Sequence, residues 1–309
     1  MDPLSSLVAL MRPQTVVSKL VSGSGCWAAR YARSGIPGFG VVVTGKCHFR
    51  ADGCEPVELS EGDFTLLPTG PGFVIASDPD VEPDDMQACP AAAILAETQL
   101  GPKTGTPDFR LLGGYFRFGA PNSEMLTQIL PALIHVKCAD NTARRIADTL
   151  GSLRGEALDQ RPGRDLIIQR LIEVMLIEAL RYRSEQGDAS ARPGLLNGLA
   201  DDRVGRALTS LHADVARPWS VASLAEEAHL SRTAFSERFS RLVGMPPMTY
   251  LTKWRMAVAK DILQRKRLPQ DVVAATVGYQ SASAFNTAFR REVGQAPGEY
   301  IRANLVLTA

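Results

Sequence analysis

Residues 281–290 read Ser281-Ala282-Ser283-Ala284-Phe285-Asn286-Thr287-Ala288-Phe289-Arg290, and their pattern repeats that of residues 231–240, Ser231-Arg232-Thr233-Ala234-Phe235-Ser236-Glu237-Arg238-Phe239-Ser240. The serine and both phenylalanines recur 50 residues apart, as do a following glycine (Gly244 and Gly294) and a tyrosine (Tyr250 and Tyr300). Recurrence at one fixed period indicates a duplicated structural unit.

Each copy predicts a short helix, a tight turn and a longer second helix, over about 221–242 and 269–292. Ser231 and Ser281 stand where a helix N-cap is expected, and phenylalanines at i and i+4 place one aromatic face inward. The outward face then carries mostly short polar side chains, which suit base edges in a DNA major groove. They are Arg232, Thr233, Ser236 and Glu237 in the first copy and Ala282, Ser283, Asn286 and Thr287 in the second.

The segment between the copies predicts one continuous helix, from Met248 to Lys266. At 1.5 Å per residue its length is about 28 Å. One turn of B-DNA is about 34 Å, so both second helices could enter successive major grooves. Cations for phosphate contacts are available at Arg238, Arg241, Arg265, Lys266, Arg267, Arg290 and Arg291.

Basic residues gather in the same part of the chain. The 309 residues are nearly neutral overall, with 34 Lys/Arg and 33 Asp/Glu, but residues 203–309 hold 15 Lys/Arg against 8 Asp/Glu. Residues 1–202 hold 19 against 25. This division predicts two domains with different partners. A composition of 45% hydrophobic and 22% charged residues excludes a disordered or fibrous chain.

The sequence predicts a cytoplasmic protein. Its start lacks the basic flank of a secretory signal, and no run of 18 apolar residues could span a bilayer. The five cysteines are scattered and odd in number, which favours a reducing compartment over a disulfide framework.

The first part of the chain predicts a β-sandwich or barrel. Short strands are expected within residues 38–76 and again at 110–118, separated by turn signals. Helical spacing follows at 124–134, 142–153 and 165–183. The last of these is apolar over more than one stripe, so we expect it to pack on its own domain and on a second copy of the chain.

Residues 203–303 resemble the DNA-binding domain of the AraC/XylS family of bacterial transcription regulators. The resemblance rests on Gly278-Tyr279, Ser283, Phe285, Phe289, Gly294, Pro297 and Tyr300-Ile301-Arg302. It implies promoter DNA and RNA polymerase as partners. Many members carry arginine where this chain has Glu237 and Thr287, so the target sequence does not carry over from the family.

The strands before residue 120 are similar to the cupin-type sensor domain of this family, through the segment Gly62-Asp63-Phe64-Thr65-Leu66-Leu67-Pro68. The predicted fold is therefore multidomain α+β. A cupin-like barrel at 1–120 precedes a helical dimerisation region at 121–184, a linker at 185–202 and an all-α domain at 203–303 with two helix-turn-helix motifs.

The barrel is predicted to lack catalysis, metal and cofactor. A cupin metal site needs several histidines and a carboxylate, whereas His48 stands alone and Phe73 occupies a place where a second histidine could return. Two loop cysteines, Cys26 and Cys89, are candidates for oxidant sensing, although small apolar filling is the simpler interpretation of all five.

The prediction is a non-enzymatic, sequence-specific transcription regulator, an activator that forms a homodimer. Its N-terminal domain would respond to a small molecule or to a redox signal. One alternative is a metal-dependent cupin enzyme fused to a DNA-binding domain. Another is an architectural DNA binder with no sensing role.

Overall fold

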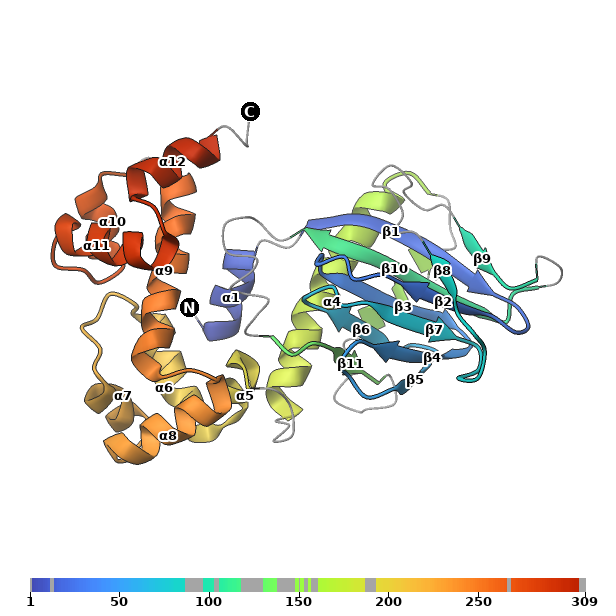
Figure 1. Cartoon of the computed structure of the whole chain (residues 1–309), viewed down its shortest axis with the longest axis horizontal. Helices are drawn as coiled ribbons and strands as arrows, with labels where there is room; N and C mark the ends of the chain where they lie inside the picture. The colour runs from blue at the N-terminus through green and yellow to red at the C-terminus, as the bar shows by residue number, and fades with distance from the viewer. Residues whose placement is uncertain are drawn as a thin grey trace. The chain divides into compact units, whose positions relative to one another are not determined.

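The computed structural model describes residues 2–11, 14–86, 97–102, 106–117, 130–137, 148–149, 151–152, 155–156, 161–186, 193–265 and 268–305. They form two compact units. The β unit contains the described residues between 14 and 186, and the helical unit contains residues 2–11 together with those from 193 onward. Figure 1 labels the elements of both units.

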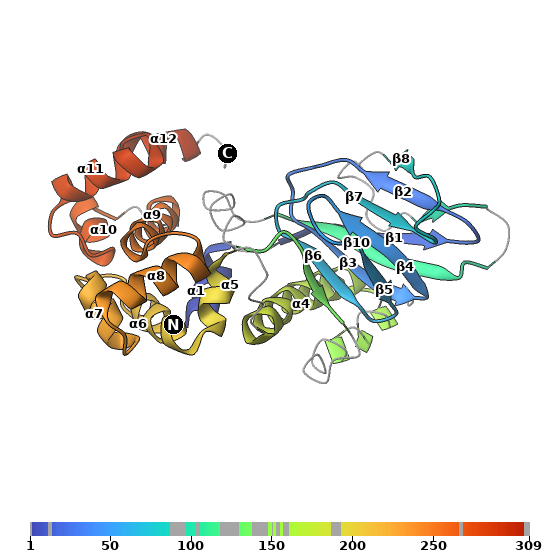
Figure 2. The same cartoon turned by 60° about the horizontal axis from the view of Figure 1, so that its bottom comes forward.

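The β unit is built from two sheets (Figure 2). The six-stranded sheet has the order β11 (Ile134–Val136), β6 (Phe64–Leu67), β3 (Gly38–Thr44), β10 (Phe109–Arg117), β1 (Gln14–Gly23) and β9 (Thr98–Leu100). The five-stranded sheet has the order β5 (Val57–Ser60), β4 (Lys46–Ala51), β7 (Phe73–Ala76), β2 (Ala28–Tyr31) and β8 (Asp84–Met86). The strands predicted within 38–76 are present, and β10 covers the described residues of the strand predicted at 110–118. The sequence did not predict β1, β2, β8, β9 or β11.

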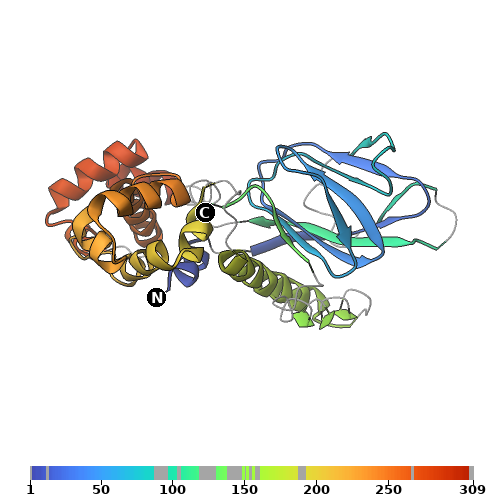
Figure 3. The same ribbon diagram turned by 90° about the horizontal axis from the view of Figure 1, so that it is seen from below.

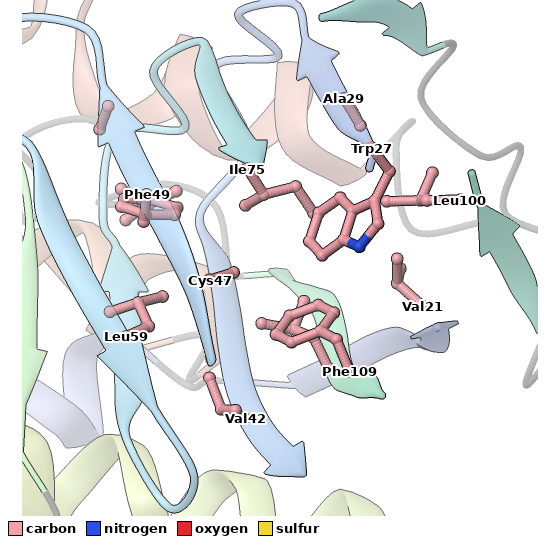
Figure 4. Close-up of a cluster of buried hydrophobic side chains, with 13 residues drawn as sticks. Val21, Trp27, Ala29, Val42, Cys47, Phe49, Leu59, Ile75, Leu100 and Phe109 are labelled. Atoms are coloured by element: carbon pink, nitrogen blue, oxygen red, sulfur yellow. The ribbon is translucent and has the colours of Figure 1, made fainter. Parts of the chain in front are cut away.

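The core of the β unit comes from side chains that alternate inward along the strands. Figure 4 shows Val42, Cys47, Phe49, Leu59 and Ile75 gathered with Trp27 and Phe109. The Trp27 and Phe109 ring centroids are 4.9 Å apart. Burial of these large apolar surfaces stabilises the two sheets against each other.

Helix α4 (Arg164–Gln186) packs on β1, β6 and β11 of the six-stranded sheet, and Figure 3 shows it running beside the strands. Its buried side includes Ile168, Ile172 and Leu176. The helix predicted at 124–134 is wrong at its end, because Ile134 belongs to β11. There Ile134 and Val136 pair with Leu66 and Phe64 of β6. Sheet pairing outweighs the helical spacing at that point. Most of the helix predicted at 142–153 lies outside the described residues.

The helical unit contains α1 (Pro3–Met11), α5 (Leu195–Ala200), α6 (Asp202–Ala213), α7 (Val221–Glu227), α8 (Arg232–Val243), α9 (Pro247–Arg265), α10 (Gln270–Thr276), α11 (Ala282–Val293) and α12 (Pro297–Leu305). The pairs α7/α8 and α10/α11 lie toward opposite ends of α9 (Figure 1). The predicted connecting helix and both helix-turn-helix motifs are present.

Two helices of this unit lie in segments for which the sequence predicted no helix. Helix α1 packs on α6 and α9 and buries Leu7 and Met11 completely. Helix α5 lies inside the predicted linker 185–202 and packs on α6 and α8. A Cβ added at Gly198 would lie 2.7 Å from Cγ2 of Val243, so the close approach of α5 to α8 depends on glycine.

Among the described residues, no helix has the length and apolar character needed to cross a bilayer.

Candidate DNA interface and signal cavity

Local hydrogen bonds explain why the first motif folds as it does. Ser220 begins α7 with a capping box, in which Ser220 Oγ accepts from Ser223 N at 3.1 Å and Ser223 Oγ accepts from Ser220 N at 2.9 Å. Ser231 caps α8 by accepting from Ala234 N at 3.3 Å. Gly244 ends α8 in the left-handed region, with φ of 84°. Each feature satisfies helix-end groups that would otherwise lack partners.

The second motif repeats these ends with one difference in the turn. Ser281 caps α11 by accepting from Ala284 N at 3.2 Å, and Gly294 ends it with φ of 81°. Five residues separate α10 from α11, whereas four separate α7 from α8. The first helices are therefore offset by 49 residues and the second helices by 50. The left-handed turn residue is His229 in the first motif and Gly278 in the second.

Equivalent aromatic residues hold each second helix on α9 or α12. In the first motif Phe239 meets Tyr250 at 5.8 Å between ring centroids, and in the second Phe289 meets Tyr300 at 5.5 Å. All four rings are buried. This packing leaves the opposite faces of α8 and α11 directed outward.

Most of the predicted base-contacting residues lie on those outward faces. In the first motif Ser231, Arg232, Thr233 and Glu237 are exposed and Ser236 is half-buried. In the second, Ser281, Ser283, Thr287 and Arg290 are exposed, and Ala282 and Asn286 are half-buried. Asn286 is engaged within the protein, since its Nδ2 donates to Oε1 of Gln270 at 3.1 Å.

Arg238 is held by a carboxylate that the sequence did not connect with it. Its Nε donates to both oxygens of Asp201, at 3.1 and 3.0 Å, and its Nη2 lies 2.6 Å from Oδ2. Asp201 also caps α6, accepting from the backbone N–H of Arg203 and Val204. Burial alone would raise the pKa of Asp201, but the Arg238 and backbone hydrogen bonds lower it below its usual value.

The remaining predicted phosphate contacts differ in their engagement. Arg241 and Arg290 are exposed. Arg265 lies 3.7 Å from Asp261, and Arg291 pairs with Glu292 at 3.0 Å. Lys266 and Arg267 lie outside the described residues.

A buried histidine supports the first motif. His212 Nε2 lies 2.7 Å from the Tyr250 hydroxyl, and the imidazole centroid is 4.2 Å from the Trp254 ring. Burial lowers the pKa of His212 to about 3, so the ring is neutral at pH 7. In the second motif Gln264 donates to the Tyr300 hydroxyl at 3.2 Å, so an uncharged amide supports that tyrosine.

The β unit contains a hollow of about 80 Å³ between its two sheets. Phe73 lines it and stacks on Tyr31 at 4.7 Å between ring centroids. His48 alternates with Cys47 and Phe49 of β4, which belong to the core between the sheets, so it points to the other face. Within the described part of the chain, no three His, Cys, Asp or Glu side chains form a group that could hold a metal ion.

The described cysteines differ in environment. Cys26 is exposed, Cys54 is half-buried and Cys47 is buried. Burial, with the charges of Asp63 and Glu58, raises the pKa of Cys47 to about 12, which keeps it a thiol. Cys89 lies outside the described residues, so its predicted sensing role stays a prediction, as does that of Cys26.

Known families match both units. A cupin family model matches residues 2–185, and a helix-turn-helix domain model matches residues 224–303. A protein of Streptomyces lividans named as an AraC-like transcription regulator is 36% identical over 97% of this chain and 98% of its own. The chain belongs to the AraC-like transcription regulators.

Two further proteins are similar to this chain. The RCS-specific HTH-type transcriptional activator RclR of Escherichia coli K12 is 26% identical over 97% of both chains. Among solved structures, the DNA-binding domain of AdpA in complex with a target DNA is 29% identical over 33% of this chain and 93% of that chain, with a TM-score of 0.32. This AraC-like protein is thus a DNA-binding transcription regulator with a cupin-like N-terminal domain.

Proposed function

We propose that this AraC-like regulator reads promoter DNA with both recognition helices, α8 and α11, and receives its signal through the β unit. The observation that carries the proposal is the pair of serine-capped helices on one scaffold, each with an exposed polar face. Base-edge contacts are assigned to Arg232, Thr233, Ser236 and Glu237 in α8 and to Ala282, Ser283 and Thr287 in α11. Ser231 and Ser281 lie at the helix starts and Arg290 near the end of α11, and phosphate contacts are assigned to them.

Glu237 and Asn286 refine this assignment. Glu237 is exposed and can accept a hydrogen bond from a cytosine amino group. Asn286 can reach a base only by giving up its bond to Gln270, so we assign it a smaller share of the readout. Arg238 is likewise assigned to holding α8 on Asp201 rather than to a free phosphate contact.

A homodimer through α4 is the second part of the proposal. One side of α4 is buried on the six-stranded sheet, yet Leu166, Ile167 and Val174 on other sides remain exposed. Ile167 and Val174 are seven residues apart, which places them on one stripe of the helix. A second copy of the chain would cover that stripe.

The β unit would transmit a signal rather than perform catalysis. Its cavity offers a place for a small molecule, whereas Cys47 is buried and keeps its proton. Oxidation of Cys26 is the alternative input. In the cytoplasm, the signal would change how the chain engages promoters and RNA polymerase, with activation as the outcome.

Selection of DNA from a random pool, followed by binding measurements across a salt series, tests the DNA part. We expect a selected sequence and a steep fall in affinity with salt, because several phosphates are neutralised. Affinity that does not change with salt would overturn the assignment. For the dimer, the double variant Ile167→Asp/Val174→Asp should sediment as a monomer, with Gln169→Glu, on a different side of the same helix, as the control.

A further inference from the structure

The hollow in the β unit lies over a row of the six-stranded sheet that has glycine at its two central positions. Across this row Thr65 of β6 pairs with Gly40 of β3, Gly40 with Gly113 of β10, and Gly113 with Lys19 of β1. Two adjacent glycines in register therefore form the floor, with a hydroxyl at one end and an ammonium group at the other. All four residues line the hollow.

The opposite wall is aromatic. Tyr31, Phe73 and Phe49 of the five-stranded sheet line the same space. Phe73 stacks on Tyr31 with an interplanar angle of 16°, and on Phe49 with an angle of 26° at 5.6 Å. Phe49 and Ile75, which Figure 4 labels, line the hollow and also belong to the core cluster.

The two walls define a slot. Facing sheets lie about 10 Å apart, a gap that two layers of side chains normally fill. Glycine at two adjacent positions thins one layer, and the remaining space faces the aromatic wall. Over Gly40 part of this space is taken by Thr65, whose Oγ1 would lie 2.9 Å from an added Cβ. The volume of the hollow, about 80 Å³, is smaller than the roughly 150 Å³ of a cavity that takes benzene, so a bound ring would extend beyond it.

The ammonium group of Lys19 favours a negatively charged ligand in the slot. Lys19 is the one charged residue among the lining residues that the structure describes, and it is half-buried. Across the described ranges it has no ion-pair partner. A carboxylate is a strong partner for an ammonium group at an apolar site, since charge-assisted hydrogen bonds are stronger than neutral ones.

We infer that the slot binds a small, flat aromatic monocarboxylate, with its ring on Tyr31 and Phe73 and its carboxylate at Lys19. The inference rests on the proposed signal-receiving role of the β unit and names the chemical class of its ligand. The ring gains stacking and burial against the aromatic wall. The glycine row allows it to approach the backbone of β3 and β10 closely.

Benzoate, benzamide and hexanoate are the probes, added to the full-length protein and followed by calorimetry and thermal unfolding. Benzoate should bind and raise Tm. Neutral benzamide, which has the same shape, should have an affinity lower by about tenfold or more. Hexanoate, which has the charge but no ring, should also bind more weakly than benzoate. Equal binding of benzoate and benzamide, or tighter binding of hexanoate, would overturn the inference.

Three variants locate the site. Lys19→Met should remove the preference for benzoate over benzamide, and the exposed Lys46→Met should keep it. Gly113→Val should abolish binding of both. The added Cβ would sit 3.4 Å from Leu111 Cδ2 and 3.6 Å from the Phe39 carbonyl oxygen, which are ordinary contacts, and the methyl groups would fill the slot. If Gly113→Val lowers the unliganded Tm strongly, the smaller Gly113→Ala should still weaken benzoate binding. Benzoate affinity unchanged in Lys19→Met or in both Gly113 variants contradicts the site.

The wild-type protein is then tested for selection of DNA from a random pool. DNA selection by a wild-type protein that does not bind benzoate overturns the ligand class and leaves the regulator intact. Loss of DNA selection in a protein that does bind benzoate counts against the proposed function and leaves the ligand class supported.

Discussion

The two helix-turn-helix motifs share their packing but differ in their charged contacts. Phe239 and Phe289, and the tyrosines that they meet, occupy equivalent buried positions. The first motif adds an Asp201–Arg238 ion pair and a buried histidine at its tyrosine, whereas the second uses the neutral side chains of Gln270 and Gln264. A duplicated scaffold can thus hold two recognition helices alike while giving each a different sensitivity to pH and charge.

The largest loss of stability should come from the buried phenylalanines that both motifs share. Phe239→Ala and Phe289→Ala should each lower the free energy of unfolding of the helical unit by about 3–5 kcal/mol, because each removes a fully buried ring. Calorimetry or chemical denaturation of the full chain measures both. A cost below about 1 kcal/mol in one variant only would show that the two cores are not equivalent.

The two motifs should differ in how their stability depends on pH. Since burial lowers the pKa of His212 to about 3, the unfolded chain binds a proton below its ordinary pKa of 6.5 while the folded chain does not. Stability is therefore lost as the pH falls from about 6.5 toward 3, by about 2 kcal/mol at pH 5. Unfolding of the wild type and His212→Gln across this range measures it. His229→Asn is the control, and an unchanged pH profile in His212→Gln would exclude the histidine as the cause.

The turns should respond unequally to substitution. Gly278→Ala should cost at least about 1–2 kcal/mol, because φ is 78° there and the new Cβ would lie 2.5 Å from the Ala216 carbonyl oxygen. His229→Gly should change stability by less than about 1 kcal/mol, since relief of the left-handed conformation opposes the entropic cost of glycine. Thermal unfolding compares the two, and equal effects would remove the distinction between the turns.

The smallest effect concerns the ion pair. Asp201→Asn keeps a capping oxygen but loses the charge facing Arg238, so we expect a loss of less than about 1 kcal/mol. Asp201→Ala loses the cap as well and should cost about 1–2 kcal/mol. Freed from its partner, Arg238 should also increase the salt dependence of DNA binding in Asp201→Asn. If both variants unfold like the wild type, Asp201 does not hold α8.

Local signals made much of the helical unit predictable. Serine caps, phenylalanines four residues apart and terminal glycines act within a few residues, so the sequence predicts α8 and α11 directly. Partners that are distant in sequence escape this reasoning. Arg238 looks like a phosphate contact until the fold brings Asp201, 37 residues away, against it. The glycine floor likewise depends on the register between β3 and β10, which the sequence does not specify.

Dependence on partners that are distant in sequence also explains the other differences between the predicted and the observed structure. Ile134 has helical spacing in the sequence but pairs with β6 in the structure. Helix α1 is short, and its apolar side chains become informative only through packing on α6 and α9. The absence of a His-x-His pair at His48 is visible in the sequence, whereas the hollow lined by Phe73 is visible only in the structure.

In the proposed function, both motifs of one chain read DNA. Footprinting of major-groove guanines on a selected DNA tests it most directly, with Arg232→Ala and Ser283→Ala to assign the contacts. We expect two protected tracts for each bound chain, about 10 base pairs apart on one face, with each variant weakening a different tract. A single tract for each bound chain, affected by only one of the two variants, would contradict it.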